Sequence, residues 1–214
     1  MSALAIKICG INTPQALDAA IAARADYIGL VFFAKSPRNV TIAQAAELAA
    51  RAAGRTKVVG LFVNAPTVFI AEAARAAKLD VVQLHGGETP DALATIRAGV
   101  GVEVWKALSV ASREDIVRAQ DFVGAADLVL FDAKAPKGAD LPGGLGLVFD
   151  WTLLSAHRGP LPWGLAGGLS PDNVADAIRR TGTPLVDVSS GVESASGVKD
   201  PELMRTFCLN ARNA

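Results

Sequence analysis

Short apolar runs alternate with alanine-rich stretches along the whole chain, and this alternation constrains the fold most strongly. The runs are rich in Val, Ile, Leu and Phe, whereas the stretches between them carry apolar residues at helical spacing. Eight runs have strand character: 5–9, 27–32, 58–63, 81–85, 102–107, 128–132, 162–166 and 185–189. Strands that alternate with helices in this way predict an α/β protein built on a parallel sheet.

Helix-start signals lie between the strand candidates. A capping side chain or a proline stands where each helix would begin, at Thr13-Pro14, Thr41, Pro66, Thr89-Pro90, Ser112, Ser170-Pro171 and Asp200-Pro201. The segment 149–157 has the weakest helix signal. Eight strand-then-helix units in 214 residues leave about 27 residues for each, near the lower end for a (βα)8 barrel. We therefore predict one (βα)8, or TIM, barrel domain over residues 1–214.

The competing architecture is a doubly wound open sheet. In its dinucleotide-binding form it carries a G-x-G-x-x-G turn after the first strand, and here that turn reads Cys9-Gly-Ile-Asn, which does not match. The stretch 134–147 is rich in Gly and Pro and is long for a connection. We expect it to act as a lid over the site, not as a domain boundary.

The charge balance and the cysteine content limit the partners and the compartment. Lys plus Arg and Asp plus Glu are both 21, so no general electrostatic attraction to nucleic acid or to an acidic membrane is expected. No apolar run approaches the roughly 20 residues that cross a bilayer, and residues 1–10 lack the pattern of a secretory signal. Cys9 and Cys208 are too few for a disulfide framework. We expect a cytoplasmic protein with free thiols and a small-molecule substrate, either a monomer or a homodimer.

Polar residues gather where the strand candidates end, which is where a barrel of this kind holds its reactive groups. The last two units also carry glycine-bearing turns, with Gly167 and Gly168 after the seventh strand and Ser190 and Gly191 after the eighth. Glycine lets backbone N–H groups approach an anion closely, and these two loops form the recurring phosphate cradle of the fold. A single such turn would often be only a tight turn. Two at these positions predict a barrel of the phosphate-binding type.

Six sequence blocks, in order along nearly the whole chain, resemble phosphoribosylanthranilate isomerase. They are Lys7-Ile-Cys-Gly-Ile, Phe62-Val-Asn, Gln83-Leu-His-Gly, Phe149-Asp-Trp, Gly167-Gly-Leu and Asp187-Val-Ser-Ser-Gly-Val-Glu. The resemblance implies the isomerase step of tryptophan biosynthesis, an Amadori rearrangement without a cofactor. In that step N-(5-phosphoribosyl)anthranilate becomes 1-(2-carboxyphenylamino)-1-deoxyribulose 5-phosphate.

The same resemblance implies roles for particular residues. The family's general base falls on Cys9 and its general acid on Asp132, and the reaction needs one of each: a proton given to the ring oxygen and a proton taken from C2. Arg38 would bind the anthranilate carboxylate, for which a planar two-pronged donor is suited. Gln83 and His85 would either line the pocket or have only a structural, hydrogen-bonding role. Asp187 would either position the substrate or anchor a loop.

Both reacting groups need an unusual pKa. A thiol titrates near 8.5, and strand alternation places Lys7 on the same side as Cys9, so we hypothesise that the lysine charge favours the thiolate. Asp132 must instead hold its proton, which burial and an anionic substrate would favour. The family commonly has Ser or Thr in place of Ala133 and Leu145, and losing those hydroxyls puts their contacts to the sugar phosphate in doubt.

Three alternatives remain. A metal site at His85 lacks companion ligands, since the other histidine, His157, lies in a segment expected at the surface. A histidine-pathway aminoaldose isomerase performs the same rearrangement, but that family uses two aspartates. Here Cys9 occupies the catalytic position on the first strand, which argues against that family. A barrel that binds a sugar phosphate without converting it is disfavoured by the Cys9 and Asp132 pair. Cys208 is expected only to pack in a helix.

Overall fold

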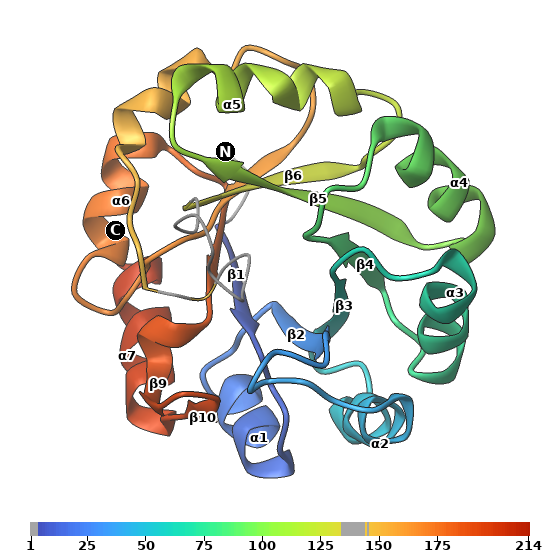
Figure 1. Cartoon of the computed structure of the whole chain (residues 1–214). Coiled ribbons are helices and arrows are strands. Elements are labelled where there is room, and N and C mark those ends of the chain that lie inside the picture. The colour runs from blue at the N-terminus through green and yellow to red at the C-terminus, as the bar shows by residue number, and fades with distance from the viewer. Residues whose placement is uncertain (1–3, 134–143, 145) are drawn as a thin grey trace.

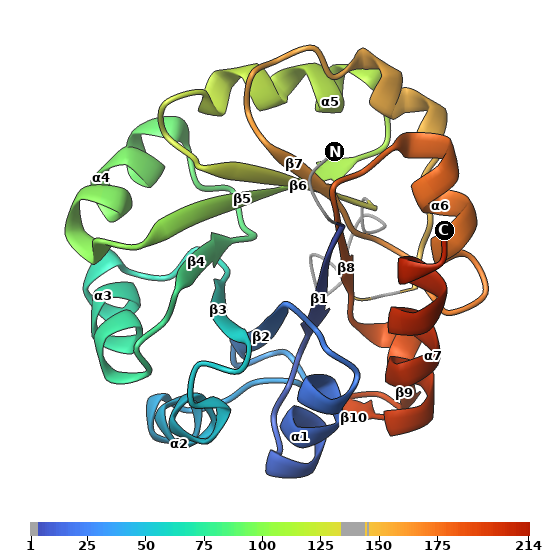
Figure 2. The same cartoon turned by 180° about the vertical axis from the view of Figure 1, so that it is seen from behind.

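The computed structural model describes residues 4–133, 144 and 146–214 and has eight parallel strands closed into a barrel (Figures 1 and 2). Each strand pairs with its sequence neighbours, and β1 pairs with β8 to close the ring. The strands are β1 (Ala5–Cys9), β2 (Tyr27–Phe32), β3 (Lys57–Phe62), β4 (Val81–Leu84), β5 (Glu103–Val110), β6 (Leu128–Ala133), β7 (Trp163–Leu165) and β8 (Leu185–Val188). The predicted (βα)8 barrel is confirmed, and the open doubly wound sheet is excluded.

Helices surround the barrel as an outer ring. They are α1 (Pro14–Ala22), α2 (Ile42–Ala52), α3 (Thr67–Ala76), α4 (Pro90–Val100), α5 (Arg113–Val117), α6 (Val174–Thr181) and α7 (Pro201–Arg212), with 3-10 helices η1 (Arg118–Phe122), η2 (Trp151–Ala156) and η3 (Ser190–Val192). The segment with the weakest helix signal forms only the 3-10 turns of η2. A short hairpin of β9 (Glu193–Ala195) and β10 (Val198–Lys199) was not predicted.

Most of the predicted helix starts are confirmed by their caps. The Thr13 and Thr89 hydroxyls accept hydrogen bonds from the third backbone N–H group beyond each, and Thr41 forms a capping box with Gln44. Asp200 accepts from the backbone N–H groups of Glu202 and Leu203.

The start predicted at Ser170-Pro171 is wrong, because α6 begins at Val174. The side chain of Asn173 bonds the backbone of Ser170 and Gly168, so the residues before the helix form a turn instead of its first helical residues.

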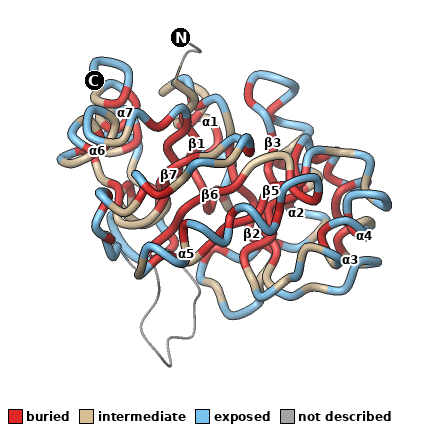
Figure 3. The backbone as a smooth tube through the Cα atoms, turned by 90° about the horizontal axis from the view of Figure 1, so that it is seen from above, coloured by how far each residue is buried: buried red, intermediate tan, exposed pale blue. Residues whose placement is uncertain are grey.

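Two apolar layers form the core, and burial follows the strands while the outer helix faces are exposed (Figure 3). The larger layer lies between the strands and the helices. Inside the barrel, Trp105 and its neighbours fill the part nearer the amino ends of the strands. Cys9, Val31 and Leu61 form a small cluster nearer the carboxyl ends. Because this interior is filled, a cavity can form only at the carboxyl ends of the strands.

Candidate active site

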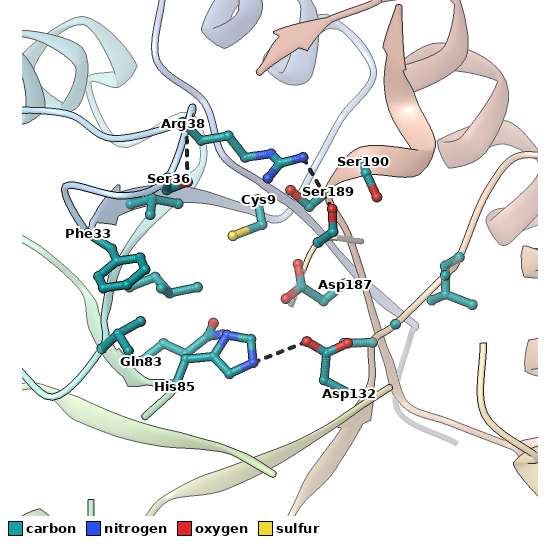
Figure 4. A pocket seen from close by; sticks show the side chains of 18 residues that line it. Cys9, Phe33, Ser36, Arg38, Gln83, His85, Asp132, Asp187, Ser189 and Ser190 are labelled. Atoms are coloured by element: carbon teal, nitrogen blue, oxygen red, sulfur yellow. Dashed lines mark hydrogen bonds and ion pairs between the residues drawn. The ribbon is translucent and has the colours of Figure 1, made fainter. Parts of the chain in front are cut away.

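A cavity opens at the carboxyl ends of the strands (Figure 4). The predicted site residues that line it come from the strand ends or the loops after them: Cys9, Arg38, Gln83, His85, Asp132, Gly167, Gly168, Asp187 and Ser190. Phe33, Ser36 and Ser189 line it as well, and sequence reasoning assigned them no role. The sulfur from the first unit and the carboxyl from the sixth therefore face one shared space.

Cys9 ends β1 and is 5% exposed. It pairs in register with Gly29 of β2, where a Cβ atom would lie 2.7 Å from the sulfur, so the glycine makes room for the thiol. Burial raises the pKa of Cys9 above its usual value, while the charges of Lys7 and Lys199 lower that pKa and Asp187 raises it. Lys7 thus acts in the predicted direction, but burial outweighs its effect on the thiol pKa.

Lys7 and Asp187 form an ion pair inside the barrel, with 2.7 Å between Nζ and Oδ2. Their strands are in register at these positions, so the pairing of β1 with β8 sets the contact. Burial raises the pKa of the Asp187 carboxyl, against the opposing effect of Lys7. Its second oxygen, Oδ1, is buried and has no hydrogen-bond partner among the residues the structure describes. Because Asp187 lines the cavity, this unpartnered oxygen is a candidate acceptor for a bound ligand.

Asp132, the penultimate residue of β6, contacts His85 in the cavity lining. His85 Nε2 lies 3.1 Å from Asp132 Oδ2, and Asp132 Oδ1 accepts from the backbone N–H of Ala133 at 2.8 Å. The backbone thereby holds Oδ1, whereas the approach of His85 Nε2 to Oδ2 is close but lacks hydrogen-bond geometry. Both side chains are buried to more than nine-tenths. Gln83 Oε1 is buried and without a hydrogen-bond partner in the described part of the chain, so it too can accept from a ligand.

Arg38 lines the cavity, but Glu193 already holds part of its guanidinium. Arg38 Nε and Nη2 donate to the two carboxylate oxygens of Glu193 at 2.7 and 2.8 Å. Lys199 Nζ donates to the same carboxylate at 2.7 Å. Neither Glu193 nor Lys199 was assigned a role from the sequence, although Glu193 ends the Asp187-Val-Ser-Ser-Gly-Val-Glu block.

The two glycine-bearing loops meet at the edge of the cavity. Gly167 and Gly168 have positive φ angles of 84° and 62°, and a Cβ on Gly167 would come within 2.3 Å of the Ala133 nitrogen. Gly191 does not line the cavity; a Cβ there would lie 1.9 Å from the Leu169 carbonyl oxygen, so this glycine lets the two loops pack together.

Some expectations fall partly or wholly outside the described residues. Leu145 lies there, as does the predicted lid over 134–147 apart from residues 144, 146 and 147. Ala133 is described and is buried. Within 4–133, 144 and 146–214, no three His, Cys, Asp or Glu side chains gather as a metal site. No helix in the same ranges is long and apolar enough to span a membrane.

A closed eight-stranded barrel with a thiol, a carboxyl and glycine-bearing loops around one cavity at its carboxyl end defines the class: a (βα)8-barrel enzyme. Residues 6–210 match the family model described as N-(5'phosphoribosyl)anthranilate (PRA) isomerase. The chain therefore belongs to the N-(5'-phosphoribosyl)anthranilate isomerase family.

Relatives support the same assignment. The N-(5'-phosphoribosyl)anthranilate isomerase of Rhodopseudomonas palustris is 51% identical over 98% of this chain and 96% of its own length. That of Rhodospirillum centenum is 52% identical over 94% of this chain and 95% of its own. The crystal structure of the Thermotoga maritima isomerase superposes with a TM-score of 0.87 at 32% identity, covering 99% of this chain and 100% of the other.

Proposed function

We propose that this enzyme carries out its family's rearrangement with Cys9 as general base and Asp132 as general acid. The substrate would be N-(5-phosphoribosyl)anthranilate and the product 1-(2-carboxyphenylamino)-1-deoxyribulose 5-phosphate. A related crystal structure, with a TM-score of 0.84, is described as a complex with reduced 1-(o-carboxyphenylamino)-1-deoxyribulose 5-phosphate. The placement of Cys9 and Asp132 around one cavity is the observation that carries the proposal.

The chemistry needs two proton transfers. Asp132 gives its proton to the furanose ring oxygen, the C1–O bond breaks, and the nitrogen lone pair forms the C=N bond of a Schiff base. The Cys9 thiolate then takes the proton from C2, those electrons form the C1=C2 bond of an enolamine, and the electron pair of the C=N bond returns to nitrogen. The C2 hydroxyl loses its proton and C1 gains one, which leaves the ketone. No electrons leave the substrate, so no redox cofactor is required.

The other site residues hold the substrate in this proposal. The loops bearing Gly167, Gly168 and Ser190 would receive the phosphate on backbone N–H groups, with Gly191 joining the two loops. Arg38 would take the anthranilate carboxylate. The unpartnered oxygens of Gln83 and Asp187 would accept from the ribose hydroxyls or the amine.

His85 would keep Asp132 directed at the ring oxygen. The 3.1 Å approach of Nε2 to Asp132 Oδ2 supports this role, because a general acid must be held within hydrogen-bond reach of the atom it protonates.

A fluorescence assay tests the proposed reaction. The fluorescence of phosphoribosylanthranilate should fall when the purified enzyme is added, and no metal or cofactor should be needed. The histidine-pathway aminoaldose is the comparison substrate, since it undergoes the same rearrangement. Turnover of the aminoaldose alone, or binding without turnover of either compound, would overturn the proposal.

The assembly and compartment are further proposals. We propose that residues 1–214 act as a single domain in the cytoplasm, because a thiol base at Cys9 requires reducing conditions and both cysteines are free. One similar structure is described as coming from a dimeric isomerase of Thermotoga maritima. We propose a monomer or a homodimer for this chain, and sedimentation equilibrium distinguishes the two from any larger assembly.

A further inference from the structure

Glu193 and Lys199 join Arg38 in a buried cluster at the rim of the cavity. Arg38 comes from the loop after β2, and the other two residues come from the β9–β10 hairpin after η3. The side chains of Arg38, Glu193 and Lys199 are 6%, 5% and 0% exposed, respectively. Figure 4 shows Arg38 extending along the cavity wall toward Ser189.

All four directions of approach to the Glu193 carboxylate are filled. Oε1 accepts from Arg38 Nε and Lys199 Nζ, both at 2.7 Å. Oε2 accepts from Arg38 Nη2 at 2.8 Å and from the backbone N–H of Gly197 at 3.1 Å. A carboxylate held by four donors cannot rotate away, so it fixes the plane of the guanidinium.

Arg38 alone would be a weak anion receptor here, because the Glu193 carboxylate cancels its charge. Lys199 changes this balance: two cations share one carboxylate, and the cluster keeps one net positive charge. The Lys199 ammonium also donates to the carbonyl of Ser189, a cavity-lining residue, at 2.8 Å. This hydrogen bond holds the positive charge of Lys199 near the residue that follows β8 in the cavity lining, beside the Arg38 guanidinium.

We infer that Lys199 is a positioning residue that, through Glu193, keeps Arg38 aligned and electrostatically able to select a substrate carrying an aromatic carboxylate. This inference rests on the proposed function, because it assigns a carboxylate to the Arg38 end of the cavity. Lys199 itself does not line the cavity, so it acts through Glu193 and Arg38.

The test compares two probes on the same protein. One is reduced 1-(o-carboxyphenylamino)-1-deoxyribulose 5-phosphate, and the other is the same compound with phenylamine in place of the carboxyphenylamine. Isothermal titration calorimetry gives a Kd for each, and the ratio of the two measures the preference for the carboxylate. Because the ratio compares two ligands on one sample, a partly unfolded fraction does not alter it.

Lys199→Gln removes the charge but keeps an amide that can donate to the Ser189 carbonyl. We expect the carboxylate preference to fall about tenfold, because one unit charge near the ligand is lost in a partly buried site. Lys199→Met should behave in the same way, and Lys199→Arg should restore the preference to within about threefold.

Lys106→Gln is the matched control. Lys106 is also a buried lysine at the carboxyl end of the barrel, but it pairs with Glu88 at 2.8 Å and does not line the cavity. Its substitution should leave the ratio unchanged. If Lys199→Gln left the ratio of the two Kd values unchanged, even with both probes bound more weakly, the inference would be overturned. A wild-type protein that binds neither probe would instead refute the proposed function.

Discussion

Lys7 and Asp187 stand opposite each other on the first and last barrel strands and meet at 2.7 Å inside the barrel. Cys9 lies two residues beyond Lys7 on the same side of β1, so the closure of the barrel also sets the electrostatic surroundings of the thiol. Lys7, Lys199 and Asp187 are the charged groups that act on it there.

Lys7→Met should raise the pKa of Cys9. Burial already raises the thiol pKa, and the substitution removes a cation that opposes that effect. The unpaired Asp187 carboxylate would act in the same direction. Since the thiolate is the active form of the base, the acid limb of kcat/KM should move to higher pH. Ultraviolet titration of the thiolate checks the direct effect. Lys57→Met, at the exposed start of β3, is the control, and an equal shift there would contradict the assignment.

Cys9→Ala and Asp132→Asn should each reduce kcat by a factor of about 10²–10⁴, because each removes one proton-transfer group. KM should change much less, since neither residue is proposed to hold the phosphate or the carboxylate. Steady-state assays with circular dichroism on the same samples separate lost chemistry from lost structure. Normal turnover by either folded variant would contradict the assigned roles.

Gly29→Ala should impair both stability and activity. The new Cβ would lie 2.7 Å from the Cys9 sulfur and 3.0 Å from the Cys9 Cα. Either the Cys9 side chain or one of the strands β1 and β2 must therefore shift. Overpacking of this kind costs about 1–3 kcal/mol, and the displaced thiol should lower kcat. Gly99→Ala is the matched control, because Gly99 lies in α4 and a Cβ added there would meet no atom within 4 Å. It should stabilise by about 0.5–1 kcal/mol and leave kcat unchanged. Denaturant unfolding measures both changes in stability.

Arg38→Lys should raise KM by about tenfold while changing kcat less. A lysine has no planar fork, so it cannot bond Glu193 along one edge and present the other to a carboxylate. Arg51→Lys, in an exposed pair with Asp18, offers the same chemical change away from the cavity. If both variants raised KM alike, Arg38 would have no special part in binding.

Cys208 should make stability fall at alkaline pH. Burial raises the pKa of this thiol to about 11 in the folded protein. Above the unfolded value near 8.5 the unfolded chain loses its proton first and binds fewer protons, so the free energy of unfolding falls as pH rises. The loss should approach a few kcal/mol between about pH 9 and 11. In Cys208→Ala the slope of melting temperature against pH over that range should be flatter, and an unchanged slope would contradict this account.

The strands and most helix starts could be predicted because they depend on local patterns. Thr13, Thr41 and Thr89 cap helices through residues three positions away, which a sequence displays directly. The Ser170-Pro171 prediction failed because Asn173 also bonds the backbone there and favours a turn.

The site was predictable only in part. Family motifs pointed to Cys9 and Asp132, and barrel geometry explains why their ends converge. The contact of Arg38 with Glu193 joins residues 155 positions apart, and the short β9–β10 hairpin that places Lys199 has little apolar alternation. No local sequence pattern indicates a contact between residues so far apart, so the roles of Glu193 and Lys199 were not predicted.

The pairing of β1 with β8 has a consequence during synthesis. The reactive sulfur on β1 leaves the ribosome before the rest of the barrel is made, yet its shelter requires β8, a strand made nearly 180 residues later. Until the ring closes, the nascent chain carries a thiol open to oxidants. In a cell with little reductant, the Cys9 thiol would therefore be oxidised in newly made chains in preference to folded ones.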